Sequence, residues 1–397
     1  MSKPAINSSP LTIAIIAGEV SGDLLGARLI QSLKKHYPNA TFEGIAGDEM
    51  QQAGCQSLYP MELLSIMGYA EVLSRLPTLL KTRKALIQRW QANPPDLMIG
   101  IDAPDFNLKI EKTLYHAGIT TAHYVSPSIW AWKEGRVKKM QGAMDLMLTL
   151  FPFEVDFYKK HNVPAEFVGH PLADEIPLEP NQLDARQKLS LQEQGFILAV
   201  LPGSRQGEIN KLAPDFIKGA NLLQKKHPDW QFVVPMVNKK LEQQFDEIKQ
   251  SIAPELVITY INGQSRVVME AADQILMASG TAVLEGMLIG RPMVAAYRVA
   301  PFTAHIIRLF KLIKSKYFTL PNNLADDYLV PELIQEELSP ENIVLEVEKQ
   351  FHQSDVEREK VIERFKEIHN QLKQNASQRA ARALYNLVER KREGSNA

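Results

Sequence analysis

The feature that most constrains this chain is an alternation of short apolar runs with longer amphipathic stretches, which occurs twice along the sequence. Gly and Pro residues stand at the turns between them. This order of strand, helix and strand is typical of a parallel β-sheet covered by helices on both faces. With 397 residues the chain exceeds one ordinary domain of about 100–200 residues, so we expect two α/β domains.

Apolar β-rich runs in the first half predict one sheet, and amphipathic stretches at residues 24–36 and 79–91 predict two of its helices. The predicted strands of this half are residues 11–17, 42–46, 96–101, 120–125, 145–150 and 166–169. A second series of runs predicts another sheet. Its strands are expected at residues 196–201, 231–237, 256–260, 274–278 and 292–297.

A Pro- and acid-rich connector at residues 171–184 separates the two series, and we interpret it as the interdomain linker. From residue 340 the sequence is polar and helical. We therefore predict doubly wound, Rossmann-like α/β domains at residues 1–175 and 176–345, and a helical tail at 346–397 that packs across both. Ligands of such sheets bind at the carboxyl ends of the strands, so the domains are expected to face a cleft.

Composition narrows the function classes. The 45 basic residues nearly balance the 46 acidic ones, so bulk nucleic-acid binding is not indicated. Cys55 is the single cysteine, which excludes a disulfide framework and fits a reducing compartment. No apolar run approaches the roughly 18 residues of a membrane span, and no signal core follows Lys3. We expect a cytoplasmic protein whose membrane contact is peripheral.

Small and polar residues gather where predicted strands end, and the first such loop is residues 18–23 (GEVSGD). Its glycines allow the backbone to approach a ligand closely, and Ser21 or Asp23 is suited to cap the following helix. A capped turn alone explains those two residues equally well, but it has no use for Glu19. The dinucleotide fingerprint G-x-G-x-x-G is absent.

The second loop, residues 100–107 (GIDAPDFN), places carboxylates directly after a strongly apolar strand. Asp102 ends the strand, where its side chain is expected to point into the cleft, whereas Asp105 follows Pro104 and suits a helix N-cap. A general base needs to lie within hydrogen-bond reach of the proton it removes. Asp102 fits that role better than Asp105, and a purely structural carboxylate is the alternative.

The third loop, residues 201–208 (LPGSRQGE), opens the second domain in the same way. A Gly203-Ser204-Arg205 turn at a helix start offers backbone N–H groups and a guanidinium, and both suit a phosphate. The alternative is a surface arginine beside a tight turn.

The fourth loop, residues 278–285 (ASGTAVLE), is the most specific local signal in the chain. Ser279, Gly280 and Thr281 are expected to present N–H and O–H donors to a diphosphate at a helix start. Glu285 lies four residues after Thr281, on the same helix face, where its carboxylate can accept hydrogen bonds from ribose hydroxyls.

The remaining histidines and aromatics are less informative. We interpret His123 as structural rather than catalytic, and we place His170, beside the linker, at the acceptor side or cleft, where it can touch a ligand phosphate. The run at residues 129–132 (IWAW) suits a sugar or lipid platform and equally well packing. No His and carboxylate residues show metal-ligand spacing, so no metal is assigned.

Basic amphipathic segments occur at residues 63–90 and 301–318, one in each predicted domain. Such segments bind anionic bilayer surfaces, and each basic residue contributes about 1 kcal/mol near the surface. An ordinary surface helix that packs its apolar stripe on a sheet shows the same periodicity, and so does a dimer interface. The presence of two such segments favours contact with a membrane surface.

The loops named above, together with residues 124–132 (YVSPSIWAW), resemble the lipid-A-disaccharide synthases, in the same order and from residue 11 to about residue 385. The resemblance implies the two-domain GT-B glycosyltransferase fold. It implies transfer of 2,3-diacylglucosamine from its UDP derivative to the 6-hydroxyl of 2,3-diacylglucosamine 1-phosphate. This inverting reaction gives a β-1,6 disaccharide and UDP, and it needs no metal or other cofactor. It further implies a peripheral protein at the cytoplasmic face of the Gram-negative inner membrane, and a possible homodimer that exchanges C-terminal parts.

Carried over by position, the resemblance makes Asp102 the leading candidate for the base, with Glu19 as the alternative. By the same resemblance Glu19 lines the acceptor side of the cleft. Ser21, Asp105 and His170 are assigned to the acceptor side or the cleft. In the C-terminal domain the donor diphosphate is assigned to Gly203, Ser204 and Arg205 and to the turn of Ser279, Gly280 and Thr281, with Glu285 on the ribose. Asn322, in the Leu-Pro-Asn stretch at residues 320–322, is expected to contact the ligand.

Other functions fit part of the same pattern. One is another GT-B enzyme, such as a UDP-N-acetylglucosamine epimerase or the N-acetylglucosaminyltransferase that acts on a peptidoglycan precursor. A different class is a non-catalytic, membrane-associated module that binds a nucleotide. The basic apolar segments disfavour an epimerase that acts on a soluble sugar.

Overall fold

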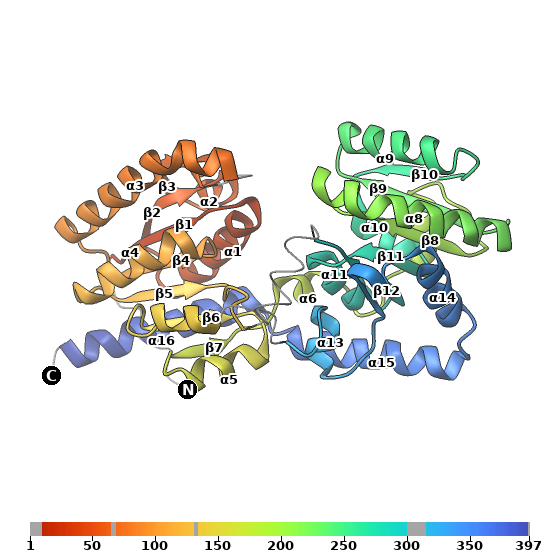
Figure 1. The fold of residues 1–397 in the computed structure, drawn as a ribbon. Helices are drawn as coiled ribbons and strands as arrows, with labels where there is room; N and C mark the ends of the chain where they lie inside the picture. The colour runs from red at the N-terminus through yellow and green to blue at the C-terminus, as the bar shows by residue number, and fades with distance from the viewer. Residues whose placement is uncertain (1–9, 65–68, 131–133, 300–314, 396–397) are drawn as a thin grey trace. The chain divides into compact units, whose positions relative to one another are not determined.

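The computed structural model describes residues 10–64, 69–130, 134–299 and 315–395. The chain forms two compact units, one of residues 1–174 with 372–397 and one of residues 175–371. Each unit is a twisted parallel sheet with helices on both faces (Figure 1). The expected fold class, two parallel-sheet α/β domains, is confirmed.

In the described part of the chain the first unit has a seven-stranded sheet of order β3-β2-β1-β4-β5-β6-β7, in which neighbouring strands run parallel. Strand β3 was not predicted from the sequence, because it is a half-exposed edge strand without a clear apolar run. The strands are β1 (Thr12–Ala17), β2 (Thr41–Ala46), β3 (Cys55–Pro60), β4 (Leu97–Ile101), β5 (Thr121–Tyr124), β6 (Leu146–Thr149) and β7 (Ala165–Phe167).

Adjacent residues of β4 show the two faces of this sheet. Ile101 lies against Gly22 and Gly26 of α1 (Val20–His36), whereas Gly100 lies against Asn107 of α4 (Pro104–His116). Helices α1 and α4 therefore cover opposite faces, and α3 packs beside α4. The other helices of this unit are α2 (Asp48–Gln52), η1 (Met61–Leu63), α3 (Tyr69–Ala92), η2 (Glu134–Lys139), α5 (Pro152–Lys160) and α16 (Ala376–Ser395).

The second unit has a six-stranded parallel sheet of order β10-β9-β8-β11-β12-β13 within the residues described. Strand β10 lies three residues later than its predicted start, and the three-residue strand β13 is too short to leave a periodic pattern. The strands are β8 (Ile197–Leu201), β9 (Gln231–Met236), β10 (Thr259–Asn262), β11 (Gln274–Ala278), β12 (Met293–Tyr297) and β13 (Glu332–Ile334).

Helices again cover both faces of the second sheet. Helix α8 packs with α9 and α14 over one core, while Gly286 of α11 lies against Ile275 on the other face. The helices are α7 (Gln182–Lys188), α8 (Gln206–Lys226), α9 (Lys239–Ile252), α10 (Ser265–Ala271), α11 (Thr281–Ile289), α13 (Leu320–Ala325), η3 (Gln335–Glu337), α14 (Pro340–Phe351) and α15 (Asp355–Leu372).

The chain passes from one unit to the other twice. The first crossing lies in the short helix α6 (Pro171–Glu175), at the start of the predicted connector. The second follows α15, after which α16 packs beside α1 in the first unit. The carboxylate of Asp174 accepts hydrogen bonds from the backbone N–H groups of Asn375 and Ala376 and so caps α16. The C-terminal helices are thus divided between the units, with α15 in the second as far as Gln371 and α16 in the first.

Candidate active site

Three loops leave the carboxyl edge of the first sheet next to one another. The register pairs Ala17 of β1 with Ile101 of β4, and Ile101 with Tyr124 of β5. A Cβ on Gly18 would lie 2.7 Å from Cβ of Ala103, so glycine is needed where the β1 and β4 loops meet. The loops that carry Glu19 and Asp102 are therefore in contact, as their positions after neighbouring strands indicate.

The backbone at the ends of β4 and β5 is strained. Asp102, Ala103 and Val125 have φ angles of 49°, 43° and 79°, in the left-handed region that L-residues seldom adopt. Asp102 is half-buried, and its N–H group donates to the carbonyl of Tyr124 at 2.9 Å. Residues held in such conformations gather at functional sites, because the surrounding structure supplies the energy that the strain costs. The geometry therefore favours a functional role at the position predicted for the base.

Helix α4 begins differently from the prediction. Its N-cap residue is Ala103, Pro104 is the first helical residue, and Asp105 follows inside the first turn. The expectation that Asp105 is the N-cap was wrong, because Pro104 fits the first helical position, where no N–H group is needed. The Asp105 side chain is 90% exposed and forms a 3.8 Å ion pair with Arg136, a surface contact of small energetic weight.

Neither candidate cap in the β1 loop caps α1. Glu19 is the N-cap residue, with an exposed side chain, and Ser21 is exposed in the first turn. Asp23 is 3% exposed, and its carboxylate accepts hydrogen bonds from three backbone N–H groups at the start of α2. Asp23 therefore caps a helix distant in sequence, which a local pattern could not reveal.

A further acid at this edge of the sheet, in addition to Glu19 and Asp102, was not predicted from the sequence. Glu154 of α5 is 2% exposed and accepts a hydrogen bond from the N–H of Phe151 at 3.0 Å. Burial raises the pKa of Glu154 to about 7, although hydrogen bonds from Ser126 and from the backbone oppose the shift. Its sequence signal is a glutamate at the third position of a helix, which also suits an ordinary capping box.

His170 and Trp130 pack with aromatic rings in the same unit. His170 is 7% exposed, and its ring stacks on that of Phe151. The backbone N–H of His170 donates a hydrogen bond to the carbonyl of Leu372. His170 therefore helps to hold the segments in which the chain passes from one unit to the other. Trp130 contacts the ring of Phe153 edge-on. Ala131 and Trp132, the rest of the predicted aromatic platform, lie outside the described residues.

In the second unit the two predicted phosphate loops leave adjacent strands, since the register pairs Met277 of β11 with Leu201 of β8. Gly203 has a φ angle of 115°, which favours glycine. Arg205 is the N-cap residue of α8, and its side chain is 74% exposed. The carboxylate of Glu208 accepts a hydrogen bond from the N–H of Ser204 at 2.9 Å. A bound phosphate would compete with Glu208 for that N–H group.

The turn at residues 279–281 forms the N-terminal end of α11. Gly280 is the N-cap residue and no side chain caps the helix, so its first N–H groups are suited to receive an anion. Glu285 lies one turn further on, and one carboxylate oxygen is 3.5 Å from Nε of Arg266. Burial raises the pKa of Glu285, and the nearby Arg266 opposes the shift.

The side chain of Asn322 has a structural role in the second unit, and its expected contact with a ligand stays a prediction. Asn322 is 0% exposed, and its amide donates to the Val330 carbonyl and to the carboxylate of Glu332, both at 2.8 Å. Its oxygen accepts from the N–H groups of Leu329 and Val330. All of the hydrogen-bonding groups of this side chain are therefore used inside the protein, where they hold the segment after α13.

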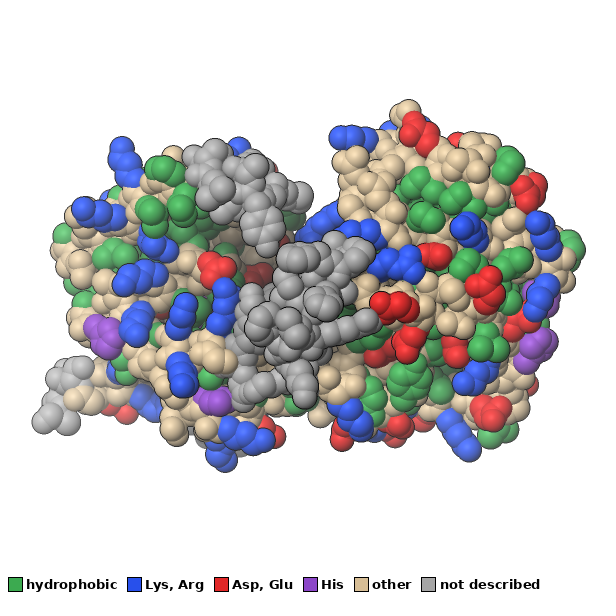
Figure 2. Space-filling model, viewed as in Figure 1, with side chains coloured by type: hydrophobic (Ala, Val, Ile, Leu, Met, Phe, Trp, Pro, Cys, Tyr) green, Lys and Arg blue, Asp and Glu red, His purple; other side chains and the backbone are tan. Residues whose placement is uncertain are grey.

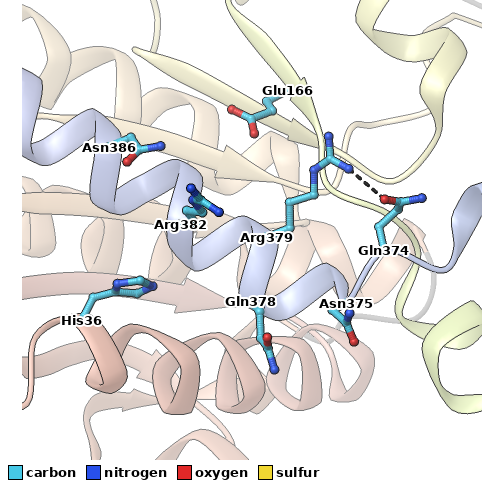
Figure 3. A pocket seen from close by; sticks show the side chains of 8 residues that line it. All are labelled: His36, Glu166, Gln374, Asn375, Gln378, Arg379, Arg382 and Asn386. Carbon is cyan, nitrogen blue, oxygen red and sulfur yellow. Dashed lines mark hydrogen bonds between the residues drawn. The ribbon is translucent and has the colours of Figure 1, made fainter. Parts of the chain in front are cut away.

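Some features lie outside the predicted loops. A polar pocket of about 550 Å³ lies along α16, with lining side chains on both sides of that helix (Figure 3). No described residues form a cluster of three or more His, Cys, Asp or Glu that could hold a metal ion. Among the helices described, none is long and apolar enough to cross a membrane.

Two parallel-sheet units, each with small and charged residues at its strand ends, define a protein of the GT-B class. A solved structure of UDP-GlcNAc 2-epimerase from Neisseria meningitidis has a similar fold, with a TM-score of 0.61 and 14% identity over 95% of this chain and 100% of that one. The structure titled as the glycotransferase of kitacinnamycin has a TM-score of 0.57 and 14% identity over 95% and 99% of the two chains. At these identities the likeness shows the fold alone.

The chain belongs to the lipid-A-disaccharide synthase family of glycosyltransferases. Residues 13–384 match the family described as lipid-A-disaccharide synthetase. The lipid-A-disaccharide synthase of Pseudoalteromonas translucida is 50% identical over 378 residues, which are 95% of this chain and 97% of that one. The family match decides against the epimerase, the peptidoglycan-precursor transferase and the non-catalytic module.

Proposed function

We propose that this chain joins two acylated glucosamine units during lipid A biosynthesis. The donor is UDP-2,3-diacylglucosamine, and the acceptor is the 6-hydroxyl group of 2,3-diacylglucosamine 1-phosphate. The products are the β-1,6 disaccharide and UDP. The observation that carries this proposal is the match to one family along residues 13–384. The predicted phosphate loops of the second unit lie on adjacent strands, in keeping with it.

The second unit is proposed to bind the UDP part of the donor. The N-terminal end of α11 offers backbone N–H groups and the positive end of the helix dipole. Arg205 adds a forked donor on an exposed side chain, and Glu285 is placed to accept from the ribose. Fixed donors aimed at the charge that develops on the departing UDP supply the largest catalytic term, and they do so without a metal ion.

The first unit is proposed to supply the base. The carboxylate of Asp102 takes the proton of the acceptor 6-hydroxyl as the oxygen attacks the anomeric carbon. The bond between that carbon and the β-phosphate oxygen of UDP breaks, and its electron pair leaves with UDP. Attack from the face opposite the leaving group inverts the anomeric centre. Glu19, in the adjoining loop, is the alternative base and otherwise contacts the acceptor.

A transferase assay tests the reaction most simply. Purified full-length protein is incubated with both acylated substrates in detergent, with a chelator present, and the product is identified by mass spectrometry. We expect equimolar disaccharide and UDP, unchanged by the chelator. Failure to form the disaccharide would refute the reaction, and loss of product on chelation would refute the metal-free mechanism. Incubation with UDP-N-acetylglucosamine alone tests for epimerase activity, and we expect no conversion.

The protein is also proposed to bind the membrane surface through α3. The apolar stripe of α3 packs at its C-terminal half, where Leu86 and Trp90 belong to the core. Nearer its start, Leu76 and Leu80 are 41% and 45% exposed, and basic residues flank them. Lys and Arg side chains spread over the face of the first unit on which α3 and α4 lie (Figures 1 and 2). An anionic bilayer surface suits this combination. Most of the second predicted segment, residues 300–314, lies outside the described residues.

A further inference from the structure

A buried ion pair lies under β4, the strand that precedes Asp102. Glu111 of α4 and His123 of β5 are both 0% exposed, and Oε1 of Glu111 is 2.7 Å from Nδ1 of His123. The strand residue above the pair is Gly100, where a Cβ atom would lie 2.0 Å from Oε1 of Glu111. Glycine at that position therefore makes the space that the carboxylate occupies.

Glu111 raises the pKa of His123. Burial lowers the pKa of His123, but the charge and hydrogen bond of Glu111 outweigh burial, and the negative charge of Asp102 and a backbone hydrogen bond to Val125 act in the same direction. The pKa of His123 therefore ends above its ordinary value. Apolar residues in place of a buried ion pair are often as stable or more stable, so stability alone does not account for this pair.

The polar network is only partly satisfied, which makes it costly for the fold. Oε2 of Glu111 and Oδ1 of Asn107 are buried without a hydrogen-bond partner among the described residues. Buried polar groups with unused hydrogen-bonding capacity reduce stability, and where they occur in a native protein they call for a functional explanation.

Asn107 connects this network to Asp102. It lies one helical turn before Glu111, and both side chains pack against Gly100. The amide of Asn107 donates to the carbonyl of Asp102 at 2.8 Å and, at 3.4 Å, to the carbonyl of Ile101. The N–H of Asp102 is held on its other side by Tyr124. The left-handed backbone of Asp102 is thus pinned by hydrogen bonds on both of its peptide groups.

We propose that Asn107 is a positioning residue that fixes the carboxylate of Asp102 for proton transfer, and that the buried Glu111–His123 pair supports Asn107 from below. The inference rests on the proposed function, in which Asp102 is the base. Positioning of this kind has a large effect on rate, since a shift of about 1 Å in a catalytic group can reduce turnover about 100-fold. Substrate binding by the second unit does not depend on it.

The test compares Asn107→Leu, which keeps the side-chain size but removes both hydrogen bonds, with the wild-type chain in the transferase assay. We expect kcat to fall about 10- to 100-fold, while KM for the donor and the affinity for UDP change less than about twofold. Tyr37→Phe is the matched control, because it removes one buried hydrogen bond, to Glu389, at the far end of α1. Its kcat should stay at the wild-type value.

A double variant shows whether Asn107 acts through Asp102. The chain with Asp102→Asn and Asn107→Leu together should turn over within about threefold of Asp102→Asn alone, because residues that act as a unit are not additive. If Asn107→Leu does not fold, Glu111→Gln replaces it. That variant removes only the charge of the pair, and it should lower kcat with little change in donor KM.

Three results would overturn the inference in different ways. Wild-type kcat in Asn107→Leu beside a slow Asp102→Asn would leave the proposed function intact and make Asn107 merely structural. Wild-type kcat in Asp102→Asn would show that Asp102 is not the base, so the proposed mechanism and the positioning role would fall together. Additive losses in the double variant would show that Asn107 acts independently of Asp102.

Discussion

Asp102, Ala103 and Val125 occupy left-handed backbone conformations at two adjacent strand ends. Each costs on the order of 1 kcal/mol or more, and a β-branched residue such as Val125 is especially unfavourable there. The residue types at these positions suggest no such strain, so the sequence alone could not predict it. The sequence did predict that Asp102 lies where a strand ends, because the apolar run before this residue marks the strand.

Glu154 provides a pH test at the level of one residue. Its pKa is raised from 4.5 to about 7 by burial, so the folded state favours the neutral acid. The resulting stabilisation is complete below pH 4.5 and is lost as the pH rises to about 7. Between these limits wild-type stability should fall by about 3 kcal/mol relative to Glu154→Gln, which cannot ionise.

Thermal unfolding from pH 4.5 to 8 measures this difference, since about 3 kcal/mol corresponds to a shift of roughly 6–12 °C in Tm for a unit of this size. Asp156→Asn, an exposed acid on the same helix, is the control and should run parallel to the wild type. Parallel curves for Glu154→Gln and wild type would show that Glu154 titrates normally.

Asn322 and His123 mark the limit of local sequence patterns. The resemblance to the synthase family assigned Asn322 to a ligand, but it gave no sign of the partners 7 to 10 residues further along the chain. His123 was interpreted as structural and is buried, but its partner Glu111 lies on another element. Burial and pairing between elements depend on three-dimensional packing, which residue periodicity does not contain.

At the scale of elements, the apolar runs located the central strands of both sheets to within a few residues. Strand β11 coincides with its predicted range, because a strand buried on both faces reads as one continuous apolar run. The edge strand β3 and the short strand β13 were missed, because half-exposed or three-residue strands leave no such run. The loops predicted to bind phosphate follow the central strands β8 and β11 directly, as expected.

The segment that follows α13 is held by Asn322, so its loss should unfold the segment rather than remove a ligand contact. Asn322→Ala gives up four hydrogen bonds and should lower the free energy of unfolding by about 3 kcal/mol, or Tm by roughly 6–12 °C.

Arg205→Ala is the contrasting variant. Its exposed guanidinium contributes little to stability, and its loss should weaken UDP binding at least about tenfold with Tm unchanged.

Calorimetric titration with UDP and thermal unfolding, on both variants, separate the two roles. An Asn322→Ala chain with normal Tm but weak UDP binding would instead show that Asn322 contacts the ligand.

Helix α3 is the element that carries the membrane proposal. Replacement of both Leu76 and Leu80 by Ser removes its exposed apolar contacts and should reduce binding to anionic phospholipid vesicles about tenfold or more. Sedimentation with vesicles at two salt concentrations measures the effect, and the remaining binding should weaken at high salt.

Leu183→Ser is the matched control for α3, because Leu183 is 48% exposed but lies in the second unit. Its vesicle binding should equal that of the wild type. Equal binding by the α3 double variant would exclude α3 as the membrane contact.

At the scale of the whole molecule, the two units divide the proposed chemistry between them. The second unit holds the loops suited to a diphosphate. The first holds Asp102, whose backbone is strained and whose carboxylate is the proposed base. The chain returns to the first unit at Leu372, so the first unit contains an N-terminal and a C-terminal segment, whereas the second is one continuous segment. A homodimer that exchanges C-terminal parts stays a prediction.

The division of labour is tested most directly by UDP affinity and kcat measured together on Asp102→Asn. We expect the variant to bind UDP within about twofold of wild type, because the loops proposed to bind the nucleotide are intact. Its kcat should fall at least about 100-fold, the usual effect of removing a general base. An Asp102→Asn chain that forms disaccharide at the wild-type rate, or that no longer binds UDP, would contradict this division of roles between the units.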